Sequence, residues 1–266
     1  MAKIGIFATA SALKEEDKIK IDEGIKIIQS WGHEIILAKN CFYSTPIFEN
    51  NSESLMAGTI EQRIEGLYET WGQADILLAL RGGYGSIQLI DKLDYDFLSK
   101  NPKTIIGYSD ITTLFCAIES QCQSFALMFH APMLFETSSL KPNELEAFKT
   151  LLSDPANYPR SSNHKFRGGN LSLIASLIGS KYLKKFDEGE ILFLEEIKEP
   201  AYKIERMFYQ IYHAGLLDLI EELWLGKGNE AVYNYSLLET FSKEKGFKLV
   251  KDLPYGHFEK MPLRIN

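Results

Sequence analysis

The sequence is poor in cysteine. Its 266 residues include only Cys41, Cys116 and Cys122. An odd number of cysteines, with no C-x-x-C pair and no neighbouring histidine cluster, argues against a disulfide framework and against a zinc site. We therefore predict free thiols in a reducing compartment, with Cys116 in the core among apolar helical positions.

The sequence also shows no signal for a leader peptide, a membrane span or a basic surface. The N-terminal segment "MAKIGIFATASALKEEDK" has one early lysine and a short apolar stretch, too short for a signal peptide or a span. The net charge is −7 and the pI is about 5.4, with no block of like charge. We expect a cytoplasmic protein that binds neither nucleic acid nor a membrane, and an anionic substrate would need a local cationic pocket.

What is present is an alternation of apolar strands and amphipathic helices, together with enough chain for one large or two ordinary domains. This pattern predicts α/β units with a mostly parallel sheet that helices cover on both faces. In the first half it predicts strands over 3–9, 33–39, 74–80, 103–109 and 124–133, helices over 14–32, 59–73, 86–93 and 110–121, a helical turn over 94–101, and a loop over 41–58.

The composition changes after Asp154, where prolines, glycines and polar residues indicate a linker or a crossing loop. Further on, we predict a helix begun by Asn170 or Ser172, a strand that ends in two glutamates, and then a helix, a strand, a helix, a strand and a final loop. We divide the chain into an N-terminal domain (1–155), a linker (156–168) and a smaller α/β domain (169–266).

Ser109 lies in "TIIGYSDITTL", between an apolar strand and a helix. In one interpretation Ser109 or Asp110 is the N-cap of that helix. In the other, Ser109 is a nucleophile at a sharp turn, although "GYSDI" has only the first glycine of the G-x-S-x-G motif. The two are compatible, because a helix N-terminus also offers N–H groups to a developing oxyanion.

A second glycine-rich turn, "RGGYG" (81–85), follows another strand at the same sheet edge, where α/β proteins place their sites. It lacks the G-x-G-x-x-G spacing of a dinucleotide site. Its glycines allow close backbone approach to a ligand, or they simply form a turn. Arg81 is either a bidentate carboxylate ligand or part of a structural salt bridge.

A serine nucleophile needs a base and a group to orient that base. Among the five histidines, His257 in "LPYGH" is the best candidate, although a loop histidine is commonly just exposed, and His130 is a candidate for the wall of the site. Glu195 and Glu196 end a strand, and either carboxylate suits the orienting role or merely marks the strand leaving the core.

Several motifs, taken in order, resemble the LD-carboxypeptidase family, which includes muramoyltetrapeptide carboxypeptidases and the microcin C immunity peptidase. The resemblance covers most of the chain and rests on "LRGGYGS", "IIGYSDITTL", "HAPM", "RGGNLSLIASLIG", "ILFLEEIKEPAYKIERMFYQI" and "LPYGH". It implies a flavodoxin-like N-terminal domain that carries the serine, and a C-terminal domain, built around a β-barrel, that carries the glutamate and the histidine.

The resemblance also implies the site and the reaction. Ser109 would be the nucleophile, His257 the base and Glu195 the orienting acid, with Glu196 as the alternative. The N–H groups of Asp110 and Gly83 would form the oxyanion hole. The reaction would release a C-terminal D-alanine from a peptidoglycan tetrapeptide, without a metal or cofactor, in a homodimer. As substrate-binding residues we predict Arg81, Tyr84 and Arg206.

The chain departs from the family pattern in three places. It lacks a P-G-D lead-in, its linker after Asp154 is short, and it stops soon after His257, where relatives continue with a further β segment. Two alternatives stay open: a microcin-C-type peptidase that cleaves peptidyl or aminoacyl nucleotides, and a non-catalytic α/β ligand-binding protein.

Overall fold

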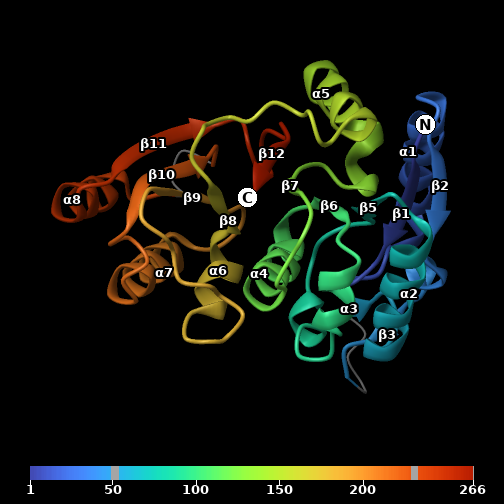
Figure 1. The fold of residues 1–266 in the computed structure, drawn as a ribbon, viewed down its shortest axis with the longest axis horizontal. Coiled ribbons are helices and arrows are strands. Elements are labelled where there is room, and N and C mark those ends of the chain that lie inside the picture. Colours follow the sequence, from blue (N-terminus) through green and yellow to red (C-terminus); the bar gives the residue numbers. More distant parts are fainter. Residues whose placement is uncertain (49–53, 229–232, 266) are drawn as a thin grey trace.

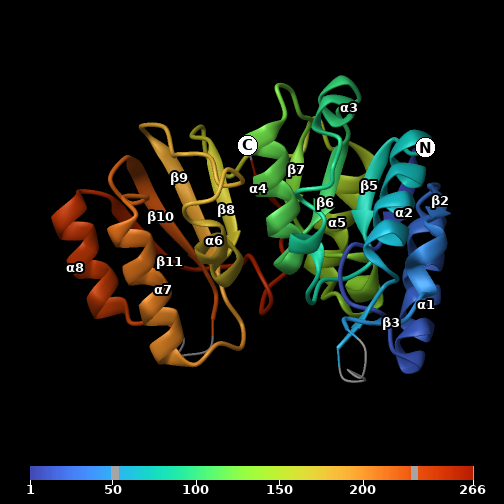
Figure 2. The ribbon, with the colours of Figure 1, turned by 90° about the horizontal axis from the view of Figure 1, so that it is seen from below.

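The computed structural model describes residues 1–48, 54–228 and 233–265, which form two lobes, each built on its own sheet (Figures 1 and 2). Residues 49–53, in the middle of the loop predicted over 41–58, lie outside the described residues. The described ends of that loop form a short antiparallel pair, β3 (Thr45–Pro46) with β4 (Leu55–Met56).

The first lobe contains a six-stranded sheet with the order β12-β7-β6-β5-β1-β2. All neighbouring strands run parallel except β12, which pairs antiparallel with β7. The predicted, mostly parallel sheet is therefore confirmed. Its strands are β1 (Lys3–Phe7), β2 (Glu34–Leu37), β5 (Ile76–Ala79), β6 (Thr104–Gly107), β7 (Met128–His130) and β12 (Leu263–Ile265).

Helices cover both faces of this sheet, as the continuous apolar strands require. On one face, α1 (Lys18–Ser30) and α5 (Pro142–Ser153) share a core with Ile4, Ile6 and Phe129. On the other face lie α2 (Ile60–Gln73), α3 (Tyr95–Lys100) and α4 (Thr112–Gln121). Two helical predictions differ: the helix over 86–93 is only a 3₁₀ turn, Ser86–Gln88, and α5 was not predicted.

The second lobe contains four parallel strands in the order β11-β10-β9-β8, with α6, α7 and α8 on one face. Among the described residues these strands form an open sheet rather than the expected β-barrel, because β11 and β8 lie at its two edges and do not pair with each other. The elements are β8 (Phe166–Asn170), α6 (Leu171–Leu177), β9 (Glu190–Glu195), α7 (Ala201–His213), β10 (Ile220–Gly226), α8 (Tyr235–Lys245) and β11 (Lys248–Leu253).

The two lobes share a core. Phe166, Ile191 and Phe193 of the second sheet belong to the same buried cluster as α2 and α4. The chain then returns to the first lobe, where the sequence predicts only a loop but β12 pairs Leu263 with His130. Figure 1 shows this last strand beside β7, between the lobes. A three-residue strand is too short to give a periodic signal, which explains why the pattern misses it.

Candidate active site

Ser109 stands two residues beyond the end of β6, in an unusual backbone conformation. Its φ is 60°, and among the described residues only Asp252 is another non-glycine residue with positive φ. Such a conformation costs free energy in an L-residue and is found preferentially at functional sites. A 3₁₀ turn, η4 (Ser109–Ile111), then leads into α4. The capping interpretation is wrong, because neither Ser109 nor Asp110 forms a side-chain cap bond and the N-cap of α4 is Ile111.

The glycine-rich turn after β5 lies directly against Ser109. A Cβ placed on Gly82 would lie 3.0 Å from the Ser109 Cβ and 3.1 Å from its Oγ. Gly83 has a φ of 116°, and a Cβ there would clash with the Ser11 hydroxyl. A larger residue at Gly82 would press on Ser109, and one at Gly83 would press on Ser11 and force a positive φ on a side chain that disfavours it.

The Asp110 side chain points into the protein rather than capping a helix. One of its oxygens accepts a hydrogen bond from the Ser86 N–H at 2.8 Å, and burial raises the pKa of Asp110 to about 6. The buried Arg63 guanidinium lies close by and donates to the carbonyl oxygens of Thr9 (2.8 Å) and Gly85 (3.0 Å). Asp110 and Arg63 thus both hold the C-terminal end of the glycine-rich turn, at the peptide unit that joins Gly85 to Ser86.

His257 and Glu195 form a buried pair. Their Nδ1 and Oε2 atoms are 2.5 Å apart, and Glu195 is only 1% exposed. Burial alone would raise the pKa of Glu195, but the charge of His257 and the hydrogen bond to it outweigh burial, so the pKa is lowered. For His257, burial is likewise outweighed by the Glu195 charge and hydrogen bond, and the pKa is raised.

The two adjacent glutamates have different partners. The Glu196 carboxylate accepts from the backbone N–H groups of Ser172 (3.2 Å) and Ile197 (2.9 Å), so it holds the start of α6. The Asn170 side-chain amide donates to both carboxylates, to Glu195 at 3.3 Å and to Glu196 at 3.4 Å, but only Glu195 also contacts His257. Of the two carboxylates, Glu195 is the one in position to orient the imidazole.

Asn170 is a residue whose second role the sequence did not reveal. It is the predicted N-cap of α6, and its side-chain oxygen accepts from the Leu173 N–H. Its backbone N–H donates to the Thr112 hydroxyl at 3.0 Å, in the first turn of the helix that follows Ser109. Asn170 therefore links the serine side of the site to Glu195.

Tyr108 brings the serine and the histidine together. Its ring lies 4.7 Å from the His257 ring, centroid to centroid, edge to face. Its hydroxyl donates to Glu136, which also lies near Lys260 of the loop that carries His257. Since Ser109 directly follows Tyr108, the structure brings Ser109, Glu195 and His257 into one region, from two lobes.

His130 forms part of the wall of this region. It is 2% exposed and packs against Tyr108 (5.2 Å) and Phe193 (4.9 Å) between ring centroids. Neither ring nitrogen has a hydrogen-bond partner among the described residues, and burial lowers the pKa of His130 to about 4. The imidazole is therefore neutral at physiological pH.

The predicted substrate-binding residues are not all near this region. Tyr84 is 46% exposed and lines, with Arg81 and Ser11, a cavity of about 430 Å³ beside the glycine-rich turn. Arg81 also donates to the Ala12 carbonyl at 3.0 Å. Arg206 lies exposed on α7, and none of its contacts in the described part of the chain reaches Ser109, Glu195 or His257.

The comparisons with known proteins agree with this architecture. The family model "LD-carboxypeptidase N-terminal domain" matches residues 4–131, and "LD-carboxypeptidase C-terminal domain" matches residues 165–265. A probable murein peptide carboxypeptidase of Bacillus subtilis is 28% identical, over 80% of this chain and 68% of its own length.

Two solved structures have the same fold. A muramoyltetrapeptide carboxypeptidase from Oxalobacter formigenes has a TM-score of 0.79 and 26% identity, over 99% of this chain and 92% of its own. The microcin C7 self-immunity protein MccF has a TM-score of 0.82 and 20% identity, over 99% of this chain and 91% of its own.

Fold and sequence together define a two-lobed α/β peptidase. The chain belongs to the LD-carboxypeptidase family, which the matches of both family models show. Membership makes it a serine-type carboxypeptidase. In the described part of the chain, no helix is long and apolar enough to cross a membrane, and no three His, Cys, Asp or Glu side chains gather as a metal site would need.

Proposed function

We propose that this protein hydrolyses the L,D-peptide bond that releases D-alanine from peptidoglycan tetrapeptides during cell-wall recycling. The similarity to proteins named murein peptide and muramoyltetrapeptide carboxypeptidase supports this substrate. The observation that carries the chemistry is the strained Ser109 beside a buried Glu195–His257 pair.

In this proposal each residue has one role. The Nδ1 of His257 forms a hydrogen bond with Glu195, so the other ring nitrogen, Nε2, is the one that takes the Ser109 proton. Ser109 Oγ then attacks the carbonyl carbon of the L-residue. His257 returns the proton to the leaving D-alanine amine, and water, activated in the same way, hydrolyses the acyl-enzyme.

The charge that develops on the carbonyl oxygen needs N–H donors. We propose the N–H groups of Asp110 and Gly83. The Gly83 N–H belongs to the peptide unit that joins it to Gly82, the glycine in contact with Ser109. Removal of one such donor costs about 10²–10³ in rate. Arg81, Tyr84 and, more remotely, Arg206 remain our proposed substrate contacts.

Ser109→Ala tests the nucleophile. We expect release of D-alanine from an L,D-tetrapeptide to fall by roughly 10⁴–10⁶-fold, because single losses of a serine nucleophile or its partners have effects of this size. Thermal unfolding of the variant should match the wild type. Equal release by both proteins would reject the serine mechanism.

The fold shared with MccF supports a second candidate, cleavage of peptidyl or aminoacyl nucleotides. The test is a direct comparison of an aminoacyl-sulfamoyl adenylate with the tetrapeptide. Cleavage of the nucleotide alone would replace the first proposal with the second. Loss of both activities in a folded Ser109→Ala protein would also exclude a non-catalytic ligand-binding role.

We further propose that the enzyme is a cytoplasmic homodimer that binds muropeptides and neither nucleic acid nor membranes. Light scattering at micromolar concentration tests the dimer, since a monomer at all concentrations would exclude it. Fractionation of cells that express the protein tests its location.

A further inference from the structure

A third carboxylate near His257, that of Glu136, is not used in the proposed reaction. It belongs to the 3₁₀ turn η5 (Leu134–Ser139), which follows β7. Because β6 and β7 are parallel neighbours, the segments that leave their carboxyl ends meet at one edge of the sheet, and Glu136 lies there beside Tyr108. Its side chain is only 13% exposed, and a carboxylate so far out of water is costly unless its surroundings compensate the charge.

The Glu136 carboxylate is fixed by its own turn. One of its oxygens accepts from the Met133 N–H at 3.3 Å, and the Glu136 N–H donates to the Met133 carbonyl at 3.0 Å. The preceding residue, Phe135, donates its N–H to the Leu80 carbonyl at 3.0 Å, which ties the turn to the residue just beyond β5. The carboxylate is therefore held in place before any substrate binds, as a group that positions another must be.

The other oxygen of Glu136 accepts from the Tyr108 hydroxyl. Tyr108 is 2% exposed, and its ring centroid lies 4.7 Å from that of His257, edge to face. Without this acceptor a buried hydroxyl would lose a partner, and the ring would lose the bond that sets its orientation. Glu136 therefore supports the His257 ring through Tyr108, whereas Glu195 bonds the imidazole directly.

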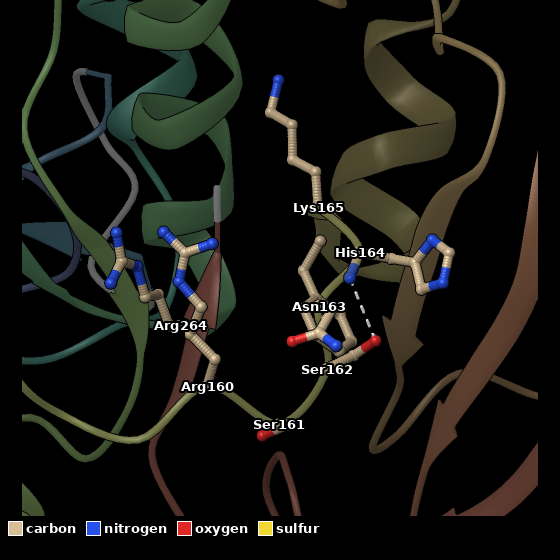
Figure 3. Close-up of a pocket in the computed structure, with 8 residues that line it drawn as sticks. Arg160, Ser161, Ser162, Asn163, His164, Lys165 and Arg264 are labelled. Atoms are coloured by element: carbon tan, nitrogen blue, oxygen red, sulfur yellow. Dashed lines mark hydrogen bonds between the residues drawn. The ribbon is translucent and has the colours of Figure 1, made fainter.

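The loop that carries His257 is anchored on both sides of the histidine. After it, the Lys260 ammonium lies 3.7 Å from Glu136. Before it, the Tyr255 hydroxyl bonds the Ser161 hydroxyl at 2.9 Å, and Figure 3 shows Ser161 on the segment that connects the two lobes. These two contacts fix how closely the imidazole approaches the Tyr108 ring.

The charge of Glu136 also acts on His257. Burial lowers the pKa of His257, but the Glu195 charge and hydrogen bond, followed by the charge of Glu136, raise it above its ordinary value. Burial raises the pKa of Glu136 itself, and the Lys260 ammonium opposes this rise. The titratable groups that surround the imidazole, with the cation beside Glu136, are Glu195, Glu196, Glu136, His130, Tyr108 and Lys260. The charge of Glu136 thus favours the imidazolium that forms when His257 takes a proton.

We propose that Glu136 is a positioning residue for the hydrolysis: through Tyr108 it orients the His257 ring, and its charge stabilises the imidazolium. The inference rests on the proposed roles of Ser109 and His257. Within the described residues, none of the hydrogen bonds or ion pairs of Glu136 reaches Ser109 or the imidazole. A group that acts through another in this way should affect kcat rather than KM.

Glu136→Gln is the test variant, because it removes the charge and keeps an oxygen that can accept from Tyr108. We expect kcat for release of D-alanine to fall by about 10–100-fold, the scale of a small misplacement of a catalytic group, with KM unchanged. Since the imidazolium loses a negative neighbour, the acid limb of the pH–rate profile, where the rate falls at low pH, should move to lower pH.

Glu259→Gln is the matched control. It removes a carboxylate from the loop that carries His257, but that carboxylate pairs with Lys227 at 2.7 Å. Both kcat and the acid limb should stay as in the wild type. A second variant, Tyr108→Phe, keeps the ring and removes its bond to Glu136, so kcat should fall about tenfold or more while the protein stays folded.

An NMR titration of the His257 ring without substrate separates this inference from the proposed hydrolysis. The ring should titrate at lower pH in Glu136→Gln than in the wild type, even if the wild type releases no D-alanine. A carboxylate with a purely structural role would change only the stability. The proposal is therefore overturned by a folded Glu136→Gln protein with the wild-type titration or the wild-type kcat, and equally by the wild-type kcat in Tyr108→Phe.

Discussion

At the scale of single residues, the Glu195 carboxylate controls the charge of His257. Because it raises the pKa of His257, and only the neutral imidazole accepts a proton, kcat/KM should fall as the pH drops through that raised pKa. In Glu195→Gln the pKa of His257 should be lower than in the wild type. The acid limb of the pH–rate profile, where the rate falls at low pH, should therefore move to lower pH. We also expect kcat to fall by about 10³–10⁴, because the amide favours the wrong tautomer. A pH–rate profile measures both effects.

The adjacent glutamate provides a matched control. Glu196→Gln keeps an oxygen that can accept from the Ser172 or Ile197 N–H, and it does not contact His257. Its acid limb should move less than that of Glu195→Gln, because Glu196 acts on His257 through its charge alone, and its kcat should stay within about tenfold. If the acid limb moves in Glu196→Gln and not in Glu195→Gln, the assignment of the orienting carboxylate is wrong.

His130 should make stability depend on pH. Its pKa is about 4 in the folded protein and about 6.5 when unfolded, so between these values the unfolded chain binds more protons. The free energy of unfolding should therefore be unaffected above pH 6.5 and fall by about 3 kcal/mol as the pH decreases to 4. Urea denaturation at several pH values measures this loss.

The variant His130→Phe removes the titrating group and keeps a ring between Tyr108 and Phe193. Because the imidazole nitrogens have no partner among the described residues, the substitution abandons no hydrogen bond. The slope of stability against pH between 6.5 and 4 should become shallower. An identical slope in both proteins would assign the acid sensitivity to other groups.

Sequence reasoning named the candidate site residues but not their geometry. The resemblance pointed to Ser109, Glu195 and His257, and the structure brings them into one region. The positive φ of Ser109 and the contact of Gly82 could not be foreseen, because both depend on how the turn after β5 packs on the turn after β6. Asn170 was recognisable as a cap, whereas its bond to Glu195 requires the neighbouring strand.

At the scale of elements, β12 is the least predictable segment and has a large effect on packing. Leu263 is fully buried in the core that the two lobes share. Leu263→Ala should lower the free energy of unfolding by about 2–5 kcal/mol, the usual cost of a buried cavity. Leu219→Ala, at a leucine that is 48% exposed, should change it by less than about 0.5 kcal/mol. Equal denaturation midpoints for the two variants would show that β12 contributes little.

The long elements were predictable because their patterns are strongly periodic. The helix α1 buries Ile21 and Ile28 on one face, and β9 is apolar from Ile191 to Leu194. Short segments such as β12 and the 3₁₀ turn at Ser86 take their conformation from tertiary contacts. Strand–helix alternation predicts parallel strands in the second lobe but does not distinguish an open sheet from a barrel, and the expectation of a barrel came from the family resemblance alone.

At the scale of the whole molecule, a buried ion network joins the two lobes. Arg167 of β8 lies 2.9 Å from Glu119 of α4 and 3.1 Å from Glu190 of β9, and its side chain is 2% exposed. The helix that contributes Glu119 begins three residues after Ser109. This network therefore helps to keep the serine of one lobe in register with the Glu195–His257 pair of the other.

Arg167→Met should cost about 3–5 kcal/mol of unfolding free energy, because it leaves two buried carboxylates with Lys165 as their one cationic partner among the described residues. Further replacement of Glu119 and Glu190 by Gln should recover part of that loss, since no buried carboxylate then remains unpaired and water can solvate the partly exposed Lys165 ammonium. Lys251→Met, which breaks an exposed ion pair with Glu239, should cost less than about 1 kcal/mol. If the triple variant is no more stable than Arg167→Met in urea denaturation, uncompensated charge is not what the arginine prevents, and packing alone joins the lobes.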